Sequence, residues 1–232
     1  MRRGEMRADG TDARGHASNE PRGAPGLLLT NRFTDAFLFA AEKHRSQTRK
    51  QTAIPYIGHL MSVAALVLEA GGDEDLAIAG LLHDVVEDCG GKPMLDEVRR
   101  RFGKRVAHVV EGCTDADTYP KPPWRERKEA YLLHVSDADQ EVRLVSAADK
   151  LHNAREILKD YREGGEPVWQ RFKGKREGTL WYYRALADEL SKENNGLVRE
   201  LQRVVSELER LARLHQPGGD LQERKEPNPC RG

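Results

Sequence analysis

The sequence predicts an all-α fold of many helices within a single chain of 232 residues. Two observations carry this prediction. Apolar residues recur at helical spacing through most of residues 29–215, and the strict alternation of apolar and polar residues that marks a half-buried strand is missing. Gly103 and the pair Gly164–Gly165 stand where helices are expected to end.

The expected helices follow one another between two polar ends. Thr30 or Asn31 can cap the first, whose apolar inner face runs from Phe33 to Ala41. The next ones are expected at residues 63–68, 76–88, 95–102, 106–113, 124–135, 142–154 and 179–190. A loop with Pro167 separates the last two.

The final helix has apolar residues at alternating steps of four and three, as in a heptad seam. They are Leu197, Leu201, Val204, Leu208 and Leu211. Two heptads are short for a coiled coil, so we expect residues 193–215 to pack on the chain's own domain. A homodimer seam is the alternative.

The chain divides into one main domain and two loose ends. Residues 29–192 suffice for one sizeable domain. Residues 1–28, rich in Gly, Arg and Asp, read as a disordered leader, and residues 216–232, with Pro, Gly and charge, as a disordered tail.

Composition excludes several classes of function. The net charge is +0 with 33% charged residues, which argues against a nucleic acid polymer as partner. No secretory signal or bilayer-spanning run is visible, so no membrane partner is expected. The three cysteines, Cys89, Cys113 and Cys230, form no metal or disulfide pattern, which suits a cytoplasmic protein.

The most informative segment is the apolar run from Leu76 to Val86, which ionisable side chains interrupt. They are His83, Asp84, Glu87 and Asp88. On a helix these would line one broad stripe, and buried carboxylates are costly unless they are paired or bound to a metal. The alternative is a hydrogen-bonded core pair next to a solvated helix end.

Two more segments place polar residues in apolar surroundings. His59 opens an apolar helix after Pro55 and Gly58, and Asp149 lies within the nearly apolar run 144–154. Together with His83 and Asp84, these residues make a candidate set for one divalent metal ion, such as manganese, iron or zinc. Because the set has no cysteine, it is unlike a structural zinc site.

These segments resemble the HD-domain metal-dependent phosphohydrolases, and more closely the hydrolase domain of RelA/SpoT proteins and their small stand-alone relatives. The matching pieces, in family order, are Arg49–Lys50 with Pro55–His59, Leu81–Asp88, Phe102–Gly103 with Val106–Ala107, Val109–Asp115 and Ala148–Asn153. The resemblance implies an HD-domain bundle around a single metal site, with His59, His83, Asp84 and Asp149 as ligands and manganese as the favoured ion.

The chain also departs from the family pattern. Leu60 follows the first metal histidine where the family has proline, and Cys89 follows Glu87–Asp88 where it has threonine. Neither change removes a ligand. Residues 117–135 look unlike the long bifunctional enzymes, and no segment resembles their synthetase domain, so we expect hydrolysis without synthesis.

The resemblance also implies roles for other residues. Glu87 and Asp88 would orient or deprotonate the attacking water, while Arg49, Lys50 and Asn153 would contact the nucleotide. We expect Lys150 and His152 to lie at the surface. For Trp181, Tyr182 and Tyr183, a core position is favoured over a wall of the nucleotide site.

The leading functional hypothesis is a hydrolase that removes the 3′-pyrophosphate from guanosine tetraphosphate or pentaphosphate, (p)ppGpp. Two alternatives stay open at this point. One is an HD phosphohydrolase acting on another nucleotide, such as NADPH or a deoxynucleotide. The other is a non-catalytic nucleotide sensor, against which the complete set of ligands and carboxylates argues.

Overall fold

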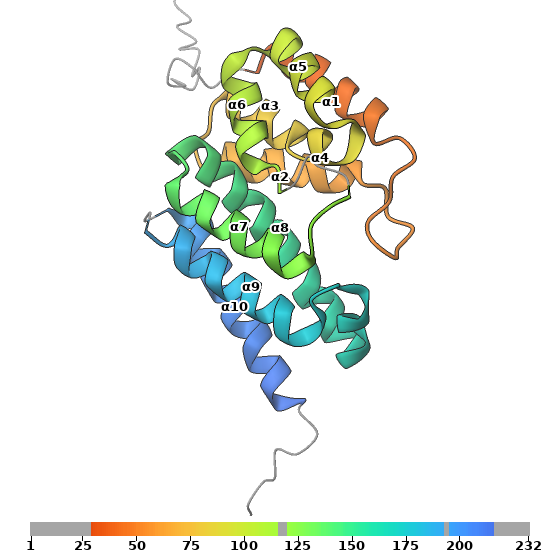
Figure 1. Cartoon of the computed structure of the whole chain (residues 1–232), viewed down its shortest axis with the longest axis vertical. Helices are drawn as coiled ribbons and strands as arrows, with labels where there is room; N and C mark the ends of the chain where they lie inside the picture. The colour runs from red at the N-terminus through yellow and green to blue at the C-terminus, as the bar shows by residue number, and fades with distance from the viewer. Residues whose placement is uncertain (1–28, 116–119, 193–194, 216–232) are drawn as a thin grey trace, which may run out of the picture.

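A computed structural model describes residues 29–115, 120–192 and 195–215, and within them the all-α prediction is confirmed (Figure 1). Ten α-helices and one 3-10 helix, and no strand, occur in these ranges. The α-helices are α1 Asn31–Lys43, α2 Ile57–Glu69, α3 Glu74–Leu82, α4 Val85–Cys89, α5 Gly91–Phe102, α6 Lys104–Cys113, α7 Trp124–Asp137, α8 Gln140–Gly164, α9 Lys175–Leu190 and α10 Gly196–Leu214. The 3-10 helix Glu166–Arg171 joins α8 to α9.

Helix ends agree with the signals in the sequence. The Thr30 side chain caps α1 by accepting a hydrogen bond from the Arg32 amide. Gly103 lies between α5 and α6 with φ +99°, a conformation that costs glycine little and other residues more. The expected leader 1–28 and tail 216–232 lie outside the described residues.

Helix α8 is the central element, since it contacts helices from both parts of the chain (Figure 1). It packs against α2, α3 and α6 on one side and against α9 and α10 on the other. Its long apolar run therefore places Asp149 in the middle of the molecule, where only 5% of that residue is exposed.

The close approach of α2 and α3 brings their polar ends together. A side chain at Gly80 would place its Cβ 3.1 Å from the Ala64 Cα, so glycine allows the two backbones to touch. As a result, the start of α2 and the end of α3 face the same part of α8.

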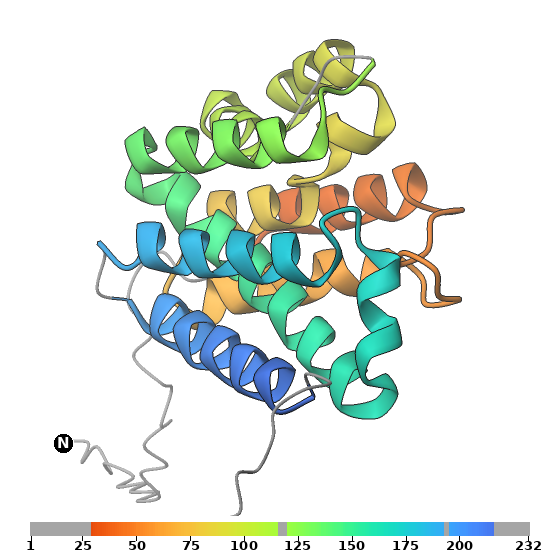
Figure 2. The same cartoon turned by 60° about the horizontal axis from the view of Figure 1, so that its bottom comes forward.

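Helix α10 lies alongside α9 (Figure 2) and covers the end of the molecule opposite α1 and α5 in Figure 1. Leu197, Leu201, Val204 and Leu208 are buried in the contact with α8 and α9. The apolar face of α10 is thus used within the chain, and a homodimer stays a prediction.

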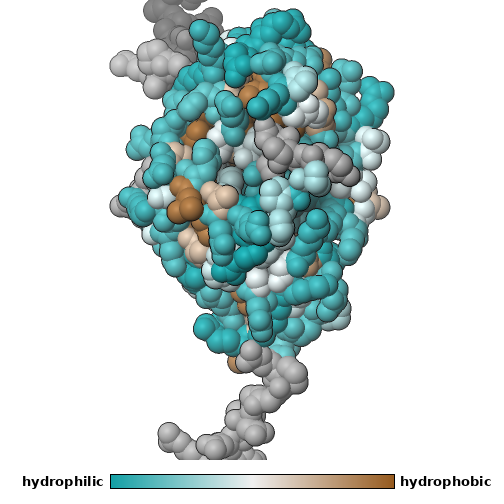
Figure 3. Space-filling model, in the orientation of Figure 1, coloured by the Kyte–Doolittle hydropathy of each residue, from teal (hydrophilic) through white to brown (hydrophobic). Residues whose placement is uncertain are grey.

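The surface is mostly hydrophilic, with hydrophobic residues in small separate groups on the face shown in Figure 3. Among the described residues, no helix combines the length and the hydropathy that a bilayer span requires.

Candidate metal centre and substrate cavity

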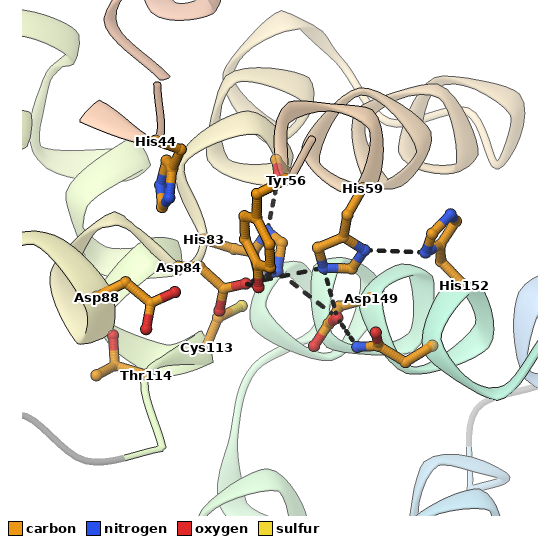
Figure 4. A network of polar contacts seen from close by, with 12 residues as sticks. His44, Tyr56, His59, His83, Asp84, Asp88, Cys113, Thr114, Asp149 and His152 are labelled. Carbon is orange, nitrogen blue, oxygen red and sulfur yellow. Dashed lines mark hydrogen bonds and ion pairs between the residues drawn. The ribbon is translucent and has the colours of Figure 1, made fainter. Parts of the chain in front are cut away.

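The four predicted metal ligands converge from three places in the chain (Figure 4). His59 lies in the first turn of α2, His83 and Asp84 join α3 to α4, and Asp149 belongs to α8. The Nε2 atom of His59 lies 3.3 Å from Asp149 Oδ1, and His83 Nε2 lies 3.6 Å from the same oxygen. His59, His83 and Asp149 present donor atoms that all lie within 4.8 Å of one another.

Asp84 lies next to this group of three, closer to His83 than to His59. Its Oδ2 lies 3.0 Å from His83 Nε2 and 3.7 Å from His59 Nε2. The same oxygen accepts a hydrogen bond of 2.5 Å from the Tyr56 hydroxyl, which fixes the carboxylate's direction.

The prediction of one continuous helix over residues 76–88 is wrong. Helix α3 ends at Leu82 and α4 begins at Val85, so His83 and Asp84 form a two-residue junction. On a continuous helix, neighbouring side chains diverge by about 100°. The break lets His83 and Asp84 face the same point, and the His83 ring nitrogen Nδ1 lies 2.9 Å from the Gly80 carbonyl oxygen left free at the helix end.

Two buried imidazole nitrogens point at the carboxylates without a hydrogen bond. They are the Nε2 atoms of His59 and His83. Because a carbonyl oxygen only accepts, His83 Nδ1 carries the proton toward Gly80 and Nε2 keeps its lone pair. His59 Nδ1 is likewise engaged, at 2.9 Å from His152 Nδ1. When His59 donates to His152 and His83 is neutral, both Nε2 atoms present a lone pair beside the two carboxylates, and this arrangement fits a divalent cation.

The charges at the site fit the same conclusion. Burial opposes ionisation of Asp149, but Lys150 and His83 outweigh it and hold the pKa of its carboxyl well below the usual range. A protonated His83 likewise holds the pKa of Asp84 low against burial, and Asp84 and Asp149 raise the pKa of His83 against its own burial. A divalent ion bound at Nε2 would take the place of this proton. Burial lowers the pKa of His59, which favours its neutral, ligating form.

The prediction that Lys150 and His152 lie at the surface is wrong. Lys150 Nζ lies 2.5 Å from Asp149 Oδ2, and its side chain is 14% exposed. His152 supports His59 through the contact between their Nδ1 atoms. His152 comes three positions after Asp149 on one helix, so helical spacing alone places both on the same face.

Glu87 and Asp88 flank the metal donors without joining them. Glu87 pairs with Lys121 at 2.7 Å, and Asp88 accepts a hydrogen bond of 2.7 Å from Gln47. Asp88 keeps one side open to solvent, while the burial of its other side and the charge of Asp84 raise the pKa of its carboxyl. Asp88 thus lies on the Asp84 side of the centre (Figure 4), whereas Glu87 lines a cavity together with Lys150 and Asn153.

The predicted substrate residues line a cavity of about 300 Å³ next to the metal donors. Its wall includes Arg49, Lys50 and Asn153 together with Phe172 and Tyr183. Arg49 donates a hydrogen bond of 2.6 Å to Asn153 Oδ1, and Asn153 Nδ2 in turn donates to Asp149 Oδ1 at 2.5 Å. The amide of Asn153 therefore connects the cavity with the metal donors.

A second lobe of about 290 Å³ shares Lys50, Asn153, Phe172 and Tyr183 with the first. It extends to Glu87 and Asp115, and its charged side chains are mostly cationic, namely Lys50, Arg127, Lys128, Lys150 and Lys173. Asp115 pairs with two of them, Arg127 and Lys128. Burial and the charges of Lys173 and Lys175 lower the pKa of Lys50. This crowding of positive charge favours an anionic ligand.

The aromatic cluster of α9 serves both as core and as cavity wall. Tyr182 and Tyr183 are buried, at 4% and 8% exposure, as the sequence predicts. Both also line the second lobe. Trp181 is half-buried and stacks against Trp124 edge to face instead.

Comparison with known proteins identifies the chain's relatives. The model of the HD domain family matches residues 36–180. The guanosine-3′,5′-bis(diphosphate) 3′-pyrophosphohydrolase MESH1 of Xenopus tropicalis is 41% identical over 133 residues, which span 56% of this chain and 72% of the relative. The human protein of the same name is 40% identical over 54% of this chain and 69% of its own length.

A more distant relative is longer than this chain. The bifunctional (p)ppGpp synthase/hydrolase SpoT of Escherichia coli is 35% identical over 54% of this chain but only 18% of its own length.

Solved structures agree with these relatives. A metazoan ortholog of SpoT described as hydrolysing ppGpp superposes with a TM-score of 0.65 and 28% identity, over 78% of this chain and 97% of that one. A protein from Listeria monocytogenes gives a TM-score of 0.57 with 30% identity, over 64% and 96% of the two chains.

Proposed function

The chain belongs to the HD domain family, and we propose that it is a metal-dependent phosphohydrolase that removes the 3′-pyrophosphate from (p)ppGpp. The observation that carries this proposal is the meeting of His59, His83 and Asp149 at one buried point. The substrate assignment draws on the relatives that are named for this activity, since this chain matches most of their length.

We propose that His59, His83, Asp84 and Asp149 hold one divalent ion, with manganese favoured and zinc or iron as alternatives. An ion held there would polarise a phosphoryl oxygen and lower the pKa of a water molecule. The two unpartnered imidazole nitrogens and the two ionised carboxylates support this assignment.

Glu87 and Asp88 orient the attacking water and accept its proton as it bonds to the phosphorus next to the ribose. The bond between that phosphorus and the 3′-oxygen breaks, the oxygen takes up a proton to become the ribose hydroxyl, and pyrophosphate is released. A carboxylate is a weak base at neutral pH, so the placement of the pair beside the metal donors matters more than its basicity. Lys150, with its charge close to Asp149, supports anion binding on this side.

Arg49, Lys50 and Asn153 bind the nucleotide in the neighbouring cavity. The Arg49 guanidinium, which lies 5.6 Å from the Tyr56 ring centre, can stack on a purine as well. Lys50 meets phosphate, and Asn153 Oδ1 has a second lone pair that can accept a ribose hydroxyl hydrogen bond. The cationic second lobe supports a substrate with more than one phosphate group.

We further propose a cytoplasmic location. Within the described residues Cys89 and Cys113 are both free, which is consistent with a reducing compartment.

Product analysis with guanosine tetraphosphate tests this function. The protein with added manganese should release pyrophosphate and guanosine diphosphate in equal amounts, and Glu87→Ala should not. Release of orthophosphate, or turnover of NADPH or a deoxynucleotide in preference to ppGpp, would contradict the substrate. Binding of ppGpp without turnover in saturating manganese would indicate a sensor.

A further inference from the structure

A buried histidine that the site described so far does not use lies behind the Gln47 amide, which donates to Asp88. His44 is the C-cap residue of α1 and is only 2% exposed. Its Nδ1 lies 2.6 Å from Gln47 Oε1, and Gln47 Nε2 donates to Asp88 Oδ2 at 2.7 Å. Figure 4 shows His44 on the same side of the centre as Asp88 and Asp84.

The hydrogen-bond roles along this chain of groups permit one arrangement. An ionised carboxylate only accepts, so the Gln47 amide must turn its NH₂ toward Asp88 and its oxygen toward His44. Since that oxygen has no proton, His44 must carry one on Nδ1. Flipping the amide would oppose oxygen to carboxylate and NH₂ to the imidazole N–H, so the orientation is fixed.

The pair is also anchored from behind. The His44 ring stacks on Tyr56, with ring centres 5.3 Å apart and an angle of 27° between the planes. The Tyr56 hydroxyl in turn holds Asp84. The carbonyl of Gln47 accepts from the Tyr56 amide at 3.0 Å, at the base of the loop that carries Arg49 and Lys50.

The Asp88 carboxylate needs a hydrogen-bond donor to fix its position because the neighbouring carboxylates repel it. Asp84 and Glu87 raise the pKa of its carboxyl, and burial does so most, whereas Gln47 and His44 lower it. Among the described residues, Gln47 is the side chain that donates a hydrogen bond to this otherwise open carboxylate. Without it, Asp88 would occupy other rotamers, turned from Asp84.

We propose that His44 and Gln47 are positioning residues that hold the Asp88 carboxylate beside the metal donors, with the Gln47 amide oriented by His44. This inference rests on the proposed function, in which Asp88 acts on the attacking water.

The test compares Gln47→Leu with wild type on guanosine tetraphosphate in saturating manganese. Loss of one hydrogen bond to a charged group should lower kcat about tenfold. KM and metal content should stay within about twofold, and the acid limb of kcat should move to higher pH because a hydrogen bond to the charged form is lost. His44→Phe keeps a ring against Tyr56 and removes the N–H that orients the Gln47 amide, so it should give a smaller change in the same direction.

Thr52→Val is the matched control. The Thr52 hydroxyl donates to the Arg49 carbonyl at 2.9 Å in the same loop. Its loss should loosen the loop and raise KM, while kcat and the acid limb stay in place. In addition, Gln47→Leu should cause no further loss of kcat in an Asp88→Asn background, because both changes act through one carboxylate.

Three results would overturn the inference. Gln47→Leu could keep the wild-type kcat and acid limb, could change KM alone as Thr52→Val does, or could reduce kcat equally with and without Asp88. In each case a wild type that releases pyrophosphate leaves the proposed function standing. A wild type that releases none contradicts the function itself, and the inference with it.

Discussion

The metal donors and the substrate cavity are adjacent but built in different ways. His59, His83 and Asp149 are at most 5% exposed, lie in or directly after helices, and contact neighbouring polar groups. The cavity is formed by the loop with Arg49 and Lys50, by Asn153 on α8, and by Phe172 and Tyr183. Lys50 in this loop is exposed. Metal binding and substrate recognition should therefore fail separately when they are mutated.

Asn153 is the point where the two regions meet. Its amide donates to Asp149 on one side and accepts from Arg49 on the other. Mutations on either side of this residue test how far metal binding and substrate recognition are separate.

The largest effect is expected from Asp149→Ala. This change removes the carboxylate that forms the group of three donor atoms with the two imidazoles, so the divalent ion and turnover should both be lost. Metal analysis after gel filtration, together with pyrophosphate release, measures the two effects. Full metal content in this variant would show that the ligand set is wrong.

Asp88→Asn and Glu87→Gln should each reduce turnover and leave metal binding unchanged. Proton transfer by a placed group contributes about 10² to 10⁴ in rate, so kcat should fall by that order while metal content stays at the wild-type level. Steady-state kinetics with metal analysis of the same samples decides the matter. Loss of metal in either variant would show that the changed carboxylate also helps to hold the ion.

His152→Phe should weaken metal binding without emptying the site. Removing the partner of a ligating histidine typically costs about 10- to 100-fold in metal affinity. Isothermal titration with manganese measures this, and added manganese should restore turnover. His134→Phe is the control, since His134 bonds the Gly112 carbonyl away from the centre. An unchanged affinity in His152→Phe would mean that the His59 contact is only structural.

Arg49→Ala should affect recognition and leave the metal in place. Loss of a stacking and hydrogen-bonding cation at a half-exposed position is expected to raise KM about tenfold. Metal affinity should not change, because Asn153 still contacts Asp149. A weakened metal affinity would show that the cavity supports the metal donors through Asn153.

The smallest effect concerns pH. The pKa of Asp88 is raised by burial and by Asp84, and this group must be ionised to accept a proton. In saturating manganese, kcat should therefore fall as the pH drops through a value above the usual carboxyl range of about 4. Asp88→Asn should abolish that limb. An acid limb that persists in Asp88→Asn would belong to another group, such as a metal ligand.

The metal donors and the residues behind Asp88 and Asp84 differ in how well the sequence could predict them. His83, Asp84 and Asp149 stand out because each interrupts an apolar run, where an ionisable residue needs a partner. His44, Gln47 and Tyr56 lie in or next to a polar loop, where such residues usually face solvent. Their positions behind Asp88 and Asp84 depend on how α1, α2 and α4 pack, which periodicity does not reveal.

Helix boundaries show a similar contrast. Gly103 marked the end of α5 correctly, because a positive φ has a sequence signal. The break after Leu82 had none, since His83 and Asp84 are compatible with a helix. A local contact of His83 with the Gly80 carbonyl and a tertiary contact with the Asp149 carboxylate decide the local structure.

The most direct test of the metal centre is anomalous diffraction at the manganese edge from crystals grown with manganese. We expect one strong peak within bonding distance of His59 Nε2, His83 Nε2 and the carboxylates of Asp84 and Asp149, with Glu87 and Asp88 outside that distance. A peak held instead by Glu87 and Asp88, or no peak among the four predicted ligands, would contradict the account.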